Sequence, residues 1–166
     1  MGIIIMRELD KCLQDVHNRL RSLGLKLAIA ESCTGGMISD LLTDIPGTSD
    51  FLLADLVVYS VKAKRIFLEI PARIIREFGV VSKQTALQMA EGVREKTGAD
   101  IGLSTTGNLG PSILEGKPDG LVYVGLSFRG RTTFRELHLK GERGEKKRLA
   151  TLEALRMLLD LLEELR

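Results

Sequence analysis

Residues 27–36 read Leu27-Ala28-Ile29-Ala30-Glu31-Ser32-Cys33-Thr34-Gly35-Gly36. An apolar run that is typical of a buried strand meets hydroxyl, thiol and glycine residues, and the apolar pattern resumes over 37–43 as a short helix. The pattern predicts a strand, a tight turn and a helix start. Side chains in such a turn project into a crevice at the carboxyl edge of a sheet, where helix N–H groups also point. Ser32 is therefore well placed for chemistry.

A purely structural role explains the same turn. Ser and Thr are favoured helix caps, and glycine adopts backbone dihedrals that other residues avoid. The turn alone leaves both interpretations open.

The composition predicts one globular domain over residues 1–166. Hydrophobic residues make up 44% and charged residues 28% of the chain, and a domain of this length buries roughly two-thirds of the surface that its unfolded chain exposes. Aromatic residues are 4%, Trp is absent, and the net charge is +2. These values argue against a nucleic-acid partner, which would need clustered basic residues or a stacking platform.

The cysteine and histidine content argues against a disulfide framework and a metal site. Cys12 and Cys33 are far apart, and no C-x-x-C or H-E-x-x-H occurs. No stretch approaches the roughly 20 apolar residues of a membrane span, and residues 1–6 are too short for a signal-peptide core. We expect a cytoplasmic protein without a membrane partner. We also expect no cofactor, since G-x-G-x-x-G is absent and Pro118 follows Gly116-Lys117 where a P-loop needs Ser or Thr.

Hydrophobic periodicity predicts helices that alternate with strands and then a hairpin. The predicted helices are 9–23, 37–43, 61–69 capped by Ser60, 71–78, 83–97 capped by Ser82, and 145–163; the predicted strands are 25–30, 51–59, 100–106, 120–128 and 131–139, the last two joined by Arg129-Gly130. A long loop covers 107–119. This order predicts an α/β fold, a three-layer α/β/α sandwich around a mixed sheet.

Serine chemistry without a histidine needs another base, and Lys64 is the candidate. Lysine serves as a base if its pKa falls from about 10.4 toward 7 or 8. If Ser60 caps the helix, Lys64 lies in its first turns, where the macrodipole and partial burial beside Tyr59 would both lower its pKa. A hydrogen bond from Tyr59 would orient Lys64 or the nucleophile. The alternative is that Lys62, Lys64 and Arg65 form a solvated helix face.

Several motifs, in order and spacing, resemble one family. They are Ala30-Glu31-Ser32-Cys33-Thr34-Gly35-Gly36, Pro46-Gly47-Thr48-Ser49, Val58-Tyr59-Ser60, Ala63-Lys64, Gly79-Val80-Val81-Ser82, Met89-Ala90-Glu91-Gly92, Thr106-Gly107 and Lys117-Pro118. From about Leu25 to the last helix, the chain resembles the C-terminal domain family of the competence/damage-inducible protein CinA. The resemblance implies a nicotinamide-nucleotide amidase, which hydrolyses nicotinamide mononucleotide to nicotinate mononucleotide and ammonia.

The same resemblance implies roles for individual residues. The family's serine–lysine pair and nearby tyrosine match Ser32, Lys64 and Tyr59. Backbone N–H groups around Thr34, Gly35 and Gly36, or around Thr106 and Gly107, would hold the oxyanion. Arg143, Lys147 and Arg148 are candidates for the substrate phosphate, although charges exposed at a helix start are the alternative.

The chain departs from the family in its loop. Members usually carry two glycines where Ala54-Asp55 stands, and further glycines where Ser112, Ile113 and Leu114 stand. Side chains at Ser112, Ile113 and Leu114 would narrow or reshape the pocket. The alternatives are therefore a catalytically weak nucleotide-binding or regulatory module, or an amidase for another small substrate. The apolar last helix leads us to expect a homo-oligomer.

Overall fold

A computed structural model describes residues 2–165, and a five-stranded sheet lies at its centre. The strands are β1 (Leu27–Glu31), β2 (Leu52–Val57), β3 (Ile101–Gly107), β4 (Leu121–Phe128) and β5 (Arg131–His138). Their order is β2-β1-β3-β4-β5, with β1 parallel to both of its neighbours and antiparallel pairing from β3 to β5. The predicted mixed sheet is confirmed.

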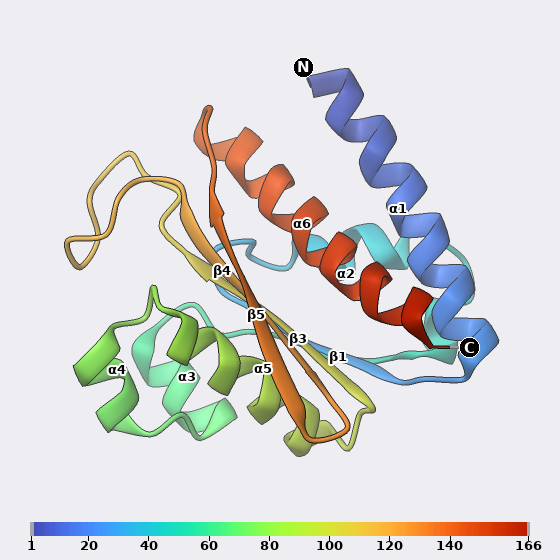
Figure 1. Ribbon diagram of the computed structural model, residues 1–166, viewed down its shortest axis with the longest axis horizontal. Helices are drawn as coiled ribbons and strands as arrows, with labels where there is room; N and C mark the ends of the chain where they lie inside the picture. The colour runs from blue at the N-terminus through green and yellow to red at the C-terminus, as the bar shows by residue number, and fades with distance from the viewer. Residues whose placement is uncertain (1, 166) are drawn as a thin grey trace.

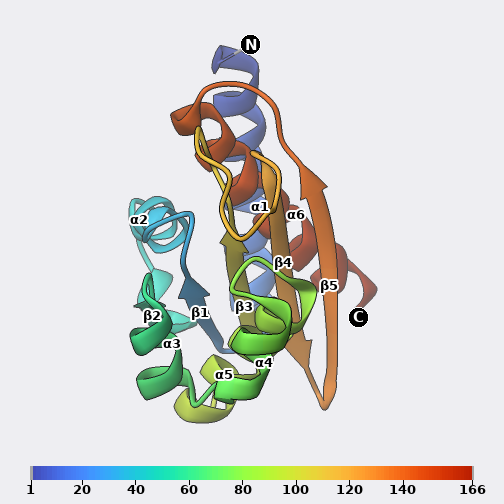
Figure 2. The same cartoon turned by 90° about the vertical axis from the view of Figure 1, so that its left-hand side faces the viewer.

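Helices cover both faces of this sheet, which confirms the three-layer sandwich (Figure 1). On one face lie α1 (Gly2–Leu23), α2 (Met37–Thr43) and α6 (Arg143–Glu164); on the other lie α3 (Val61–Leu68), α4 (Ala72–Phe78) and α5 (Lys83–Thr97). Figure 2 looks onto the sheet, with β2 at the left and β5 at the right; α3, α4 and α5 lie in front of the strands, and α1 and α6 lie behind them.

The alternation of side chains along β1 explains why both faces need a cover. Leu27 and Ile29 belong to the apolar core shared with α1 and α6, whereas Ala28 and Ala30 belong to the core under α5. All four side chains are fully buried. Successive strand residues point to opposite faces, so β1 requires a helical layer on each side.

The helix ends follow the predicted signals. The Ser60 hydroxyl accepts a hydrogen bond from Ala63 N at 3.0 Å, and the Ser82 hydroxyl accepts one from Thr85 N at 3.1 Å. Both predicted caps are confirmed. The first helix is longer than predicted: α1 begins at Gly2, because the apolar stripe extends back to Ile5, which is buried against the core. None of the helices within residues 2–165 is long and apolar enough to cross a membrane.

The chain topology creates a crevice at the carboxyl end of β1. The connection from β1 to β2 runs through α2 on one face, and the connection from β2 to β3 runs through α3, α4 and α5 on the other. In open α/β sheets, ligands bind where the connections diverge in this way, outside the carboxyl ends of the strands. Ser32 follows β1 at this edge, and Asn108 follows β3.

Candidate active site

Ser32 and Lys64 meet at the carboxyl end of β1. The Ser32 N–H group donates a hydrogen bond to Thr105 O at 3.0 Å, which fixes the first residue after β1 against β3. Lys64 lies in the first turns of α3, and its Nζ atom is 2.9 Å from Ser32 Oγ. The Lys64 residue is only 1% exposed. The two predicted residues are therefore in direct contact.

The surroundings of Lys64 favour its neutral form. Burial lowers the pKa of Lys64 from 10.5 to about 8, opposed by the nearby Cys33 and the negative charge of Glu115. Its Nζ atom donates hydrogen bonds to Val58 O at 2.8 Å and Tyr59 O at 3.3 Å. A neutral amine has two N–H bonds and one lone pair. With both N–H bonds directed to carbonyl oxygens, the lone pair is left for the Ser32 hydroxyl.

The alternative that Lys62, Lys64 and Arg65 form a solvated helix face is correct for two of these residues. Lys62 and Arg65 are exposed, whereas Lys64 is buried. The prediction that Lys64 is partly buried understated its burial, and burial is the main cause of its lowered pKa.

Cys33 is the other nucleophilic side chain in the turn, but its thiol is not activated. Burial, with a smaller effect from the Glu31 carboxylate, raises the pKa of Cys33 to about 12. The thiolate is the reactive form of cysteine. The thiol therefore stays protonated at neutral pH, which leaves Ser32 as the candidate nucleophile of the turn.

Tyr59 contacts Lys64 through its main chain rather than through its phenol. The Tyr59 side chain is at the pocket, but the residue is 63% exposed, and its hydroxyl accepts a hydrogen bond from Arg143 Nη2 at 3.3 Å. The expected hydrogen bond from the phenol to Lys64 or Ser32 is not formed. Because Tyr59 ends the strand region with its carbonyl toward Lys64, the backbone performs the orienting role that we predicted for the side chain.

The Thr34 hydroxyl and the amides of Gly35 and Gly36 form hydrogen bonds within the turn. The Thr34 hydroxyl is fully buried and donates to the Glu31 carboxylate. The Gly35 N–H group donates to Ser32 O at 3.1 Å, and the Gly36 N–H group donates to Glu31 Oε2 at 3.0 Å. The turn itself therefore uses these two of the amides that we expected around the oxyanion.

Gly107 is the better placed backbone donor. Along β3, Thr105 O accepts from Ser32 N on the β1 side, whereas Asn108 N donates to Leu121 O on the β4 side. Consecutive N–H groups of a strand point in opposite directions, so the Gly107 N–H group points toward β1 and Ser32. Gly107 has no room for a side chain, because a Cβ atom there would lie 2.6 Å from Val122 Cγ2. Thr106 lines the same pocket, and its hydroxyl donates to Val80 O at 2.7 Å.

A pocket of about 270 Å³ lies between the Ser32 turn and the loop that follows β3. This loop is organised by Asn108, whose side-chain amide donates to Ser112 O at 2.8 Å and whose Oδ1 accepts from Gly110 N at 2.9 Å. At the tip of the loop, the Glu115 carboxylate accepts hydrogen bonds from Val80 N at 2.9 Å and Val81 N at 3.3 Å. The loop is thus held by Asn108 at its base and by Glu115 at its tip.

Arg143 and Arg148 lie in different places. Arg143 lines the pocket and donates to Gly110 O at 2.5 Å. Arg148 lies in a separate hollow with residues of α1 and does not line the pocket of Ser32. Five residues turn an α-helix by roughly 140°, which separates the two side chains. Lys147 does not line the pocket. Its Nζ atom lies near Gly35, 3.6 Å from the position that a Cβ atom would take there.

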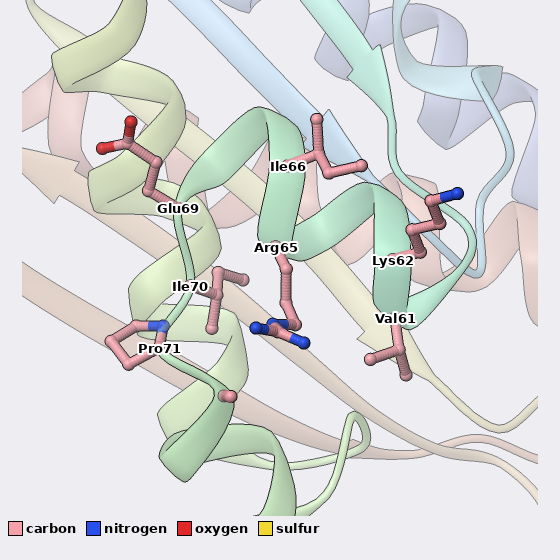
Figure 3. Close-up of a pocket in the computed structure, with 8 residues that line it drawn as sticks. Val61, Lys62, Arg65, Ile66, Glu69, Ile70 and Pro71 are labelled. Atoms are coloured by element: carbon pink, nitrogen blue, oxygen red, sulfur yellow. The ribbon is translucent and has the colours of Figure 1, made fainter.

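A larger hollow, of about 720 Å³, lies on the outer surface of α3 and the segment that leads to α4 (Figure 3). Figure 3 shows Lys62, Arg65 and Glu69 around it together with aliphatic side chains. Its lining contains no Ser, Thr, Cys or Tyr. Ser32 and Lys64 line the smaller pocket instead.

Sequence reasoning overlooked two polar residues that build the site. Glu31 is fully buried beneath the turn, and Asn108 is buried at the base of the loop. The signal for Glu31 was available, since it is the charged residue that ends an otherwise apolar buried strand. The role of Asn108 depends on how the loop folds back, and no local pattern encodes that path.

Comparisons with known proteins show the family of this chain. Residues 9–162 match the family described as the CinA C-terminal domain. A CinA-like protein of Dictyoglomus thermophilum is 44% identical over 163 residues, which covers 95% of this chain and 39% of that protein. This chain spans between 33% and 39% of the length of the first curated relatives that it matches.

Solved structures extend the likeness to the whole fold. The crystal structure of the competence/damage inducible protein CihA from Agrobacterium tumefaciens has 34% identity and a TM-score of 0.89, and the match covers 93% of this chain and 95% of that one. The competence damage-inducible protein A from Klebsiella pneumoniae has 30% identity and a TM-score of 0.92, with 95% and 99% covered.

Proposed function

The chain belongs to the CinA C-terminal domain family, and from this premise we propose that it is an amide hydrolase that converts nicotinamide mononucleotide to nicotinate mononucleotide and ammonia. The observation that carries the proposal is the contact of 2.9 Å between Ser32 Oγ and Lys64 Nζ. A hydroxyl becomes a useful nucleophile when an adjacent base accepts its proton. The lowered pKa of Lys64, about 8, makes the amine such a base near neutral pH.

In the first half of the reaction, Ser32 Oγ attacks the carbonyl carbon of the carboxamide, and its proton passes to Lys64 Nζ. The Gly107 N–H group donates to the oxyanion of the tetrahedral intermediate. Lys64 then returns the proton to the amide nitrogen, and the C–N bond breaks. Ammonia leaves, and the acyl group remains on Ser32 as an ester.

In the second half, water attacks the ester while Lys64 Nζ accepts one proton of the water. The bond between the acyl carbon and Ser32 Oγ breaks, and the proton returns from Lys64 to that oxygen. The product is the pyridine carboxylic acid, and Ser32 and Lys64 recover their starting states. Each proton that Lys64 accepts is returned within the same half-reaction, so the pair needs no further acid or base.

Arg143 supplies the positive charge at the pocket rim. Its guanidinium lies beside the Tyr59 hydroxyl and Gly110 O. Guanidinium groups bind phosphate through charge-assisted hydrogen bonds. We assign the substrate phosphate to this end of the pocket.

A second candidate function is hydrolysis of a smaller carboxamide. It is favoured by the volume of about 270 Å³, which is slightly below the range of roughly 300–1,000 Å³ typical of small-molecule sites. The side chains of Ile113 and Leu114 occupy part of the entrance. They stand where family members carry glycines.

The test is a product assay with the purified chain. Nicotinamide mononucleotide, nicotinamide riboside, nicotinamide and asparagine are supplied separately, and ammonia and the matching acid are quantified. Equal amounts of ammonia and nicotinate mononucleotide from the first substrate support the proposal. Turnover of the smaller carboxamides alone would favour the second candidate, and no turnover by a folded protein would reject both.

A further inference from the structure

Two carboxyl groups that the proposed mechanism does not use lie beneath the Ser32 turn. Glu31 is the last residue of β1, and Asp55 lies in the neighbouring β2. In the parallel register, Ile29 pairs with Asp55 and Glu31 pairs with Val57. Paired residues share a face, and so do residues two apart along a strand. Glu31 and Asp55 are therefore diagonal neighbours on the face that α2 covers.

Glu31 has the environment of an ionised carboxylate. It is 0% exposed, and its two oxygens accept hydrogen bonds from Gly36 N at 3.0 Å, Ile38 N at 2.9 Å and Ser39 N at 3.4 Å, with the Thr34 hydroxyl as a fourth donor. Three of these donors are the free N–H groups at the start of α2, where a negative charge is stabilised. Glu31 thereby fixes the path of the chain from Ser32 into α2.

Asp55 has the opposite environment. Both of its carboxyl oxygens are buried and accept no hydrogen bond from any residue of the described range 2–165. The strand register places its carboxyl group beside that of Glu31 on the same face of the sheet. Burial, and after it the neighbouring Glu31, raises the pKa of Asp55 to about 8. The nearby Ser39 groups lower this pKa and offset part of the increase. An ionised carboxylate without donors, beside a second carboxylate, is strongly disfavoured.

The other groups around the pair do not relieve this conflict. From α2, the Ser39 hydroxyl and amide face Asp55, while Asp40 is exposed to solvent. From the turn, the Cys33 thiol is neutral. From α6, Lys147 lies beside Gly35 and forms no salt bridge with either carboxyl group within residues 2–165. Within residues 2–165, neither carboxyl group forms a salt bridge, so a proton is the remaining means of neutralising one of them.

We propose that Asp55 carries a proton which it donates to the Glu31 carboxylate, and that this shared proton keeps the Ser32 turn in place. Asp55 is thus a positioning residue that acts on Ser32 through Glu31. Loss of the proton brings two negative charges into contact and weakens the hold of Glu31 on the start of α2. The catalytic consequence rests on the proposed function, whereas the shared proton does not.

Equilibrium unfolding in urea, measured without substrate from about pH 4 to 8, tests the shared proton. Because the folded pKa of Asp55 lies above its ordinary value of 3.8, the folded chain holds one proton more than the unfolded chain within this window. Stability from this proton is complete below the ordinary pKa and is lost as the pH rises through the folded pKa. Relative to Asp55→Asn, whose amide donates to Glu31 at every pH, the wild-type unfolding constant should grow by up to about tenfold per pH unit.

The control is Asp40→Asn, which removes an exposed carboxylate from the first turn of the same helix. Its unfolding constant relative to the wild type should show no comparable pH dependence. A ratio between the wild type and Asp55→Asn that is independent of pH would overturn the proposal. If Asp55→Asn does not fold, the carboxyl carbon of Asp55 in the wild type is titrated by NMR. A midpoint near pH 8 supports the shared proton, and one near 4 overturns it.

The positioning role has its own measurement. Above about pH 8, the rate of ammonia release by the wild type should fall as Asp55 ionises, whereas the rate of Asp55→Asn should stay level. An equal fall in both proteins would contradict the positioning role. If the wild type releases no ammonia at any pH, the proposed function fails, and the unfolding experiment still decides whether the proton is shared.

Discussion

Lys64 Nζ lies 2.9 Å from Ser32 Oγ although 32 positions separate the two residues along the chain. The parallel pairing of β1 with β2 explains the contact. Both strands end at the same edge of the sheet, Ser32 follows one strand, and α3 begins four residues after the end of the other. The Ser60 cap fixes the residue at which α3 begins, and Lys64, four residues after the cap, then contacts Ser32. A cap and a strand register thus position the nucleophile and its base.

Replacement of the nucleophile should abolish turnover without unfolding the protein. Ser32→Ala is expected to lower the rate of ammonia release by at least about a thousandfold, since loss of a catalytic nucleophile costs that much or more. The matched control is Cys33→Ala, which removes the neighbouring thiol that burial keeps protonated. It should retain most of the activity. Equal losses in the two variants would indicate a general disturbance of the turn.

Lys64 should destabilise the protein at neutral pH. Its folded pKa of about 8 lies below the ordinary 10.5, so stability from this group is complete above the ordinary pKa and is lost as the pH falls through 8. Lys64→Met removes this pH-dependent cost, although it also leaves Val58 O and Tyr59 O without their donor at every pH. The free energy of unfolding of the variant minus that of the wild type should therefore be higher at pH 7 than at pH 10.5 by up to about 3 kcal/mol. Urea unfolding at both pH values measures it, with Lys62→Met as the exposed control, and a difference that is the same at both pH values would contradict the assignment.

Arg143 and Arg148 should differ in their effects on the substrate phosphate. Arg143→Ala is expected to raise the KM for nicotinamide mononucleotide by roughly tenfold to a hundredfold with a smaller change in kcat, since a charged hydrogen bond contributes about 1.5–3 kcal/mol. Arg148→Ala should leave both constants unchanged, because Arg148 lies outside the pocket. Similar changes in KM for both variants would show that Arg143 acts through the overall charge of α6.

Glu115 should hold the loop onto the segment before α5. Glu115→Ala leaves the amides of Val80 and Val81 without their acceptor, so their hydrogen exchange should accelerate by about tenfold or more, measured by NMR. Glu115→Gln keeps an acceptor and should show a smaller effect. Loss of the negative charge also lowers the pKa of Lys64 further, since Glu115 raises it. Unchanged exchange at both amides would mean that the loop is held elsewhere.

Local patterns were sufficient to predict the layers of this fold. The apolar run of β1, the serine caps of α3 and α5, and the Arg129-Gly130 hairpin, whose φ angles are 48° and 77°, are each encoded by a few adjacent residues. The spacing from Ser60 to Lys64 also predicted the candidate base. These features depend on propensities and caps, which act within one turn or one strand.

The parts of the site that depend on distant contacts were not predictable in the same way. The Tyr59 phenol was expected at Lys64, but in the fold it lies against Arg143, from a helix that begins 84 positions later. The amides of Gly35 and Gly36 were expected in the pocket, but the buried Glu31 and the turn occupy them. Arg148 follows Arg143 closely in sequence, yet helical rotation places it on another surface. Side-chain direction and tertiary partners decide these outcomes.

The central claim is that Ser32 and Lys64 form a working nucleophile and base. The most direct measurement is the rate of ammonia release from nicotinamide mononucleotide against pH, with a chelator present, for the wild type and Lys64→Arg. The wild-type rate should rise by nearly tenfold per pH unit below about pH 7, as Lys64 loses its proton. Lys64→Arg should be inactive throughout, because a guanidinium keeps its proton. A wild-type rate that is flat over this range, or an active Lys64→Arg variant, would contradict the account.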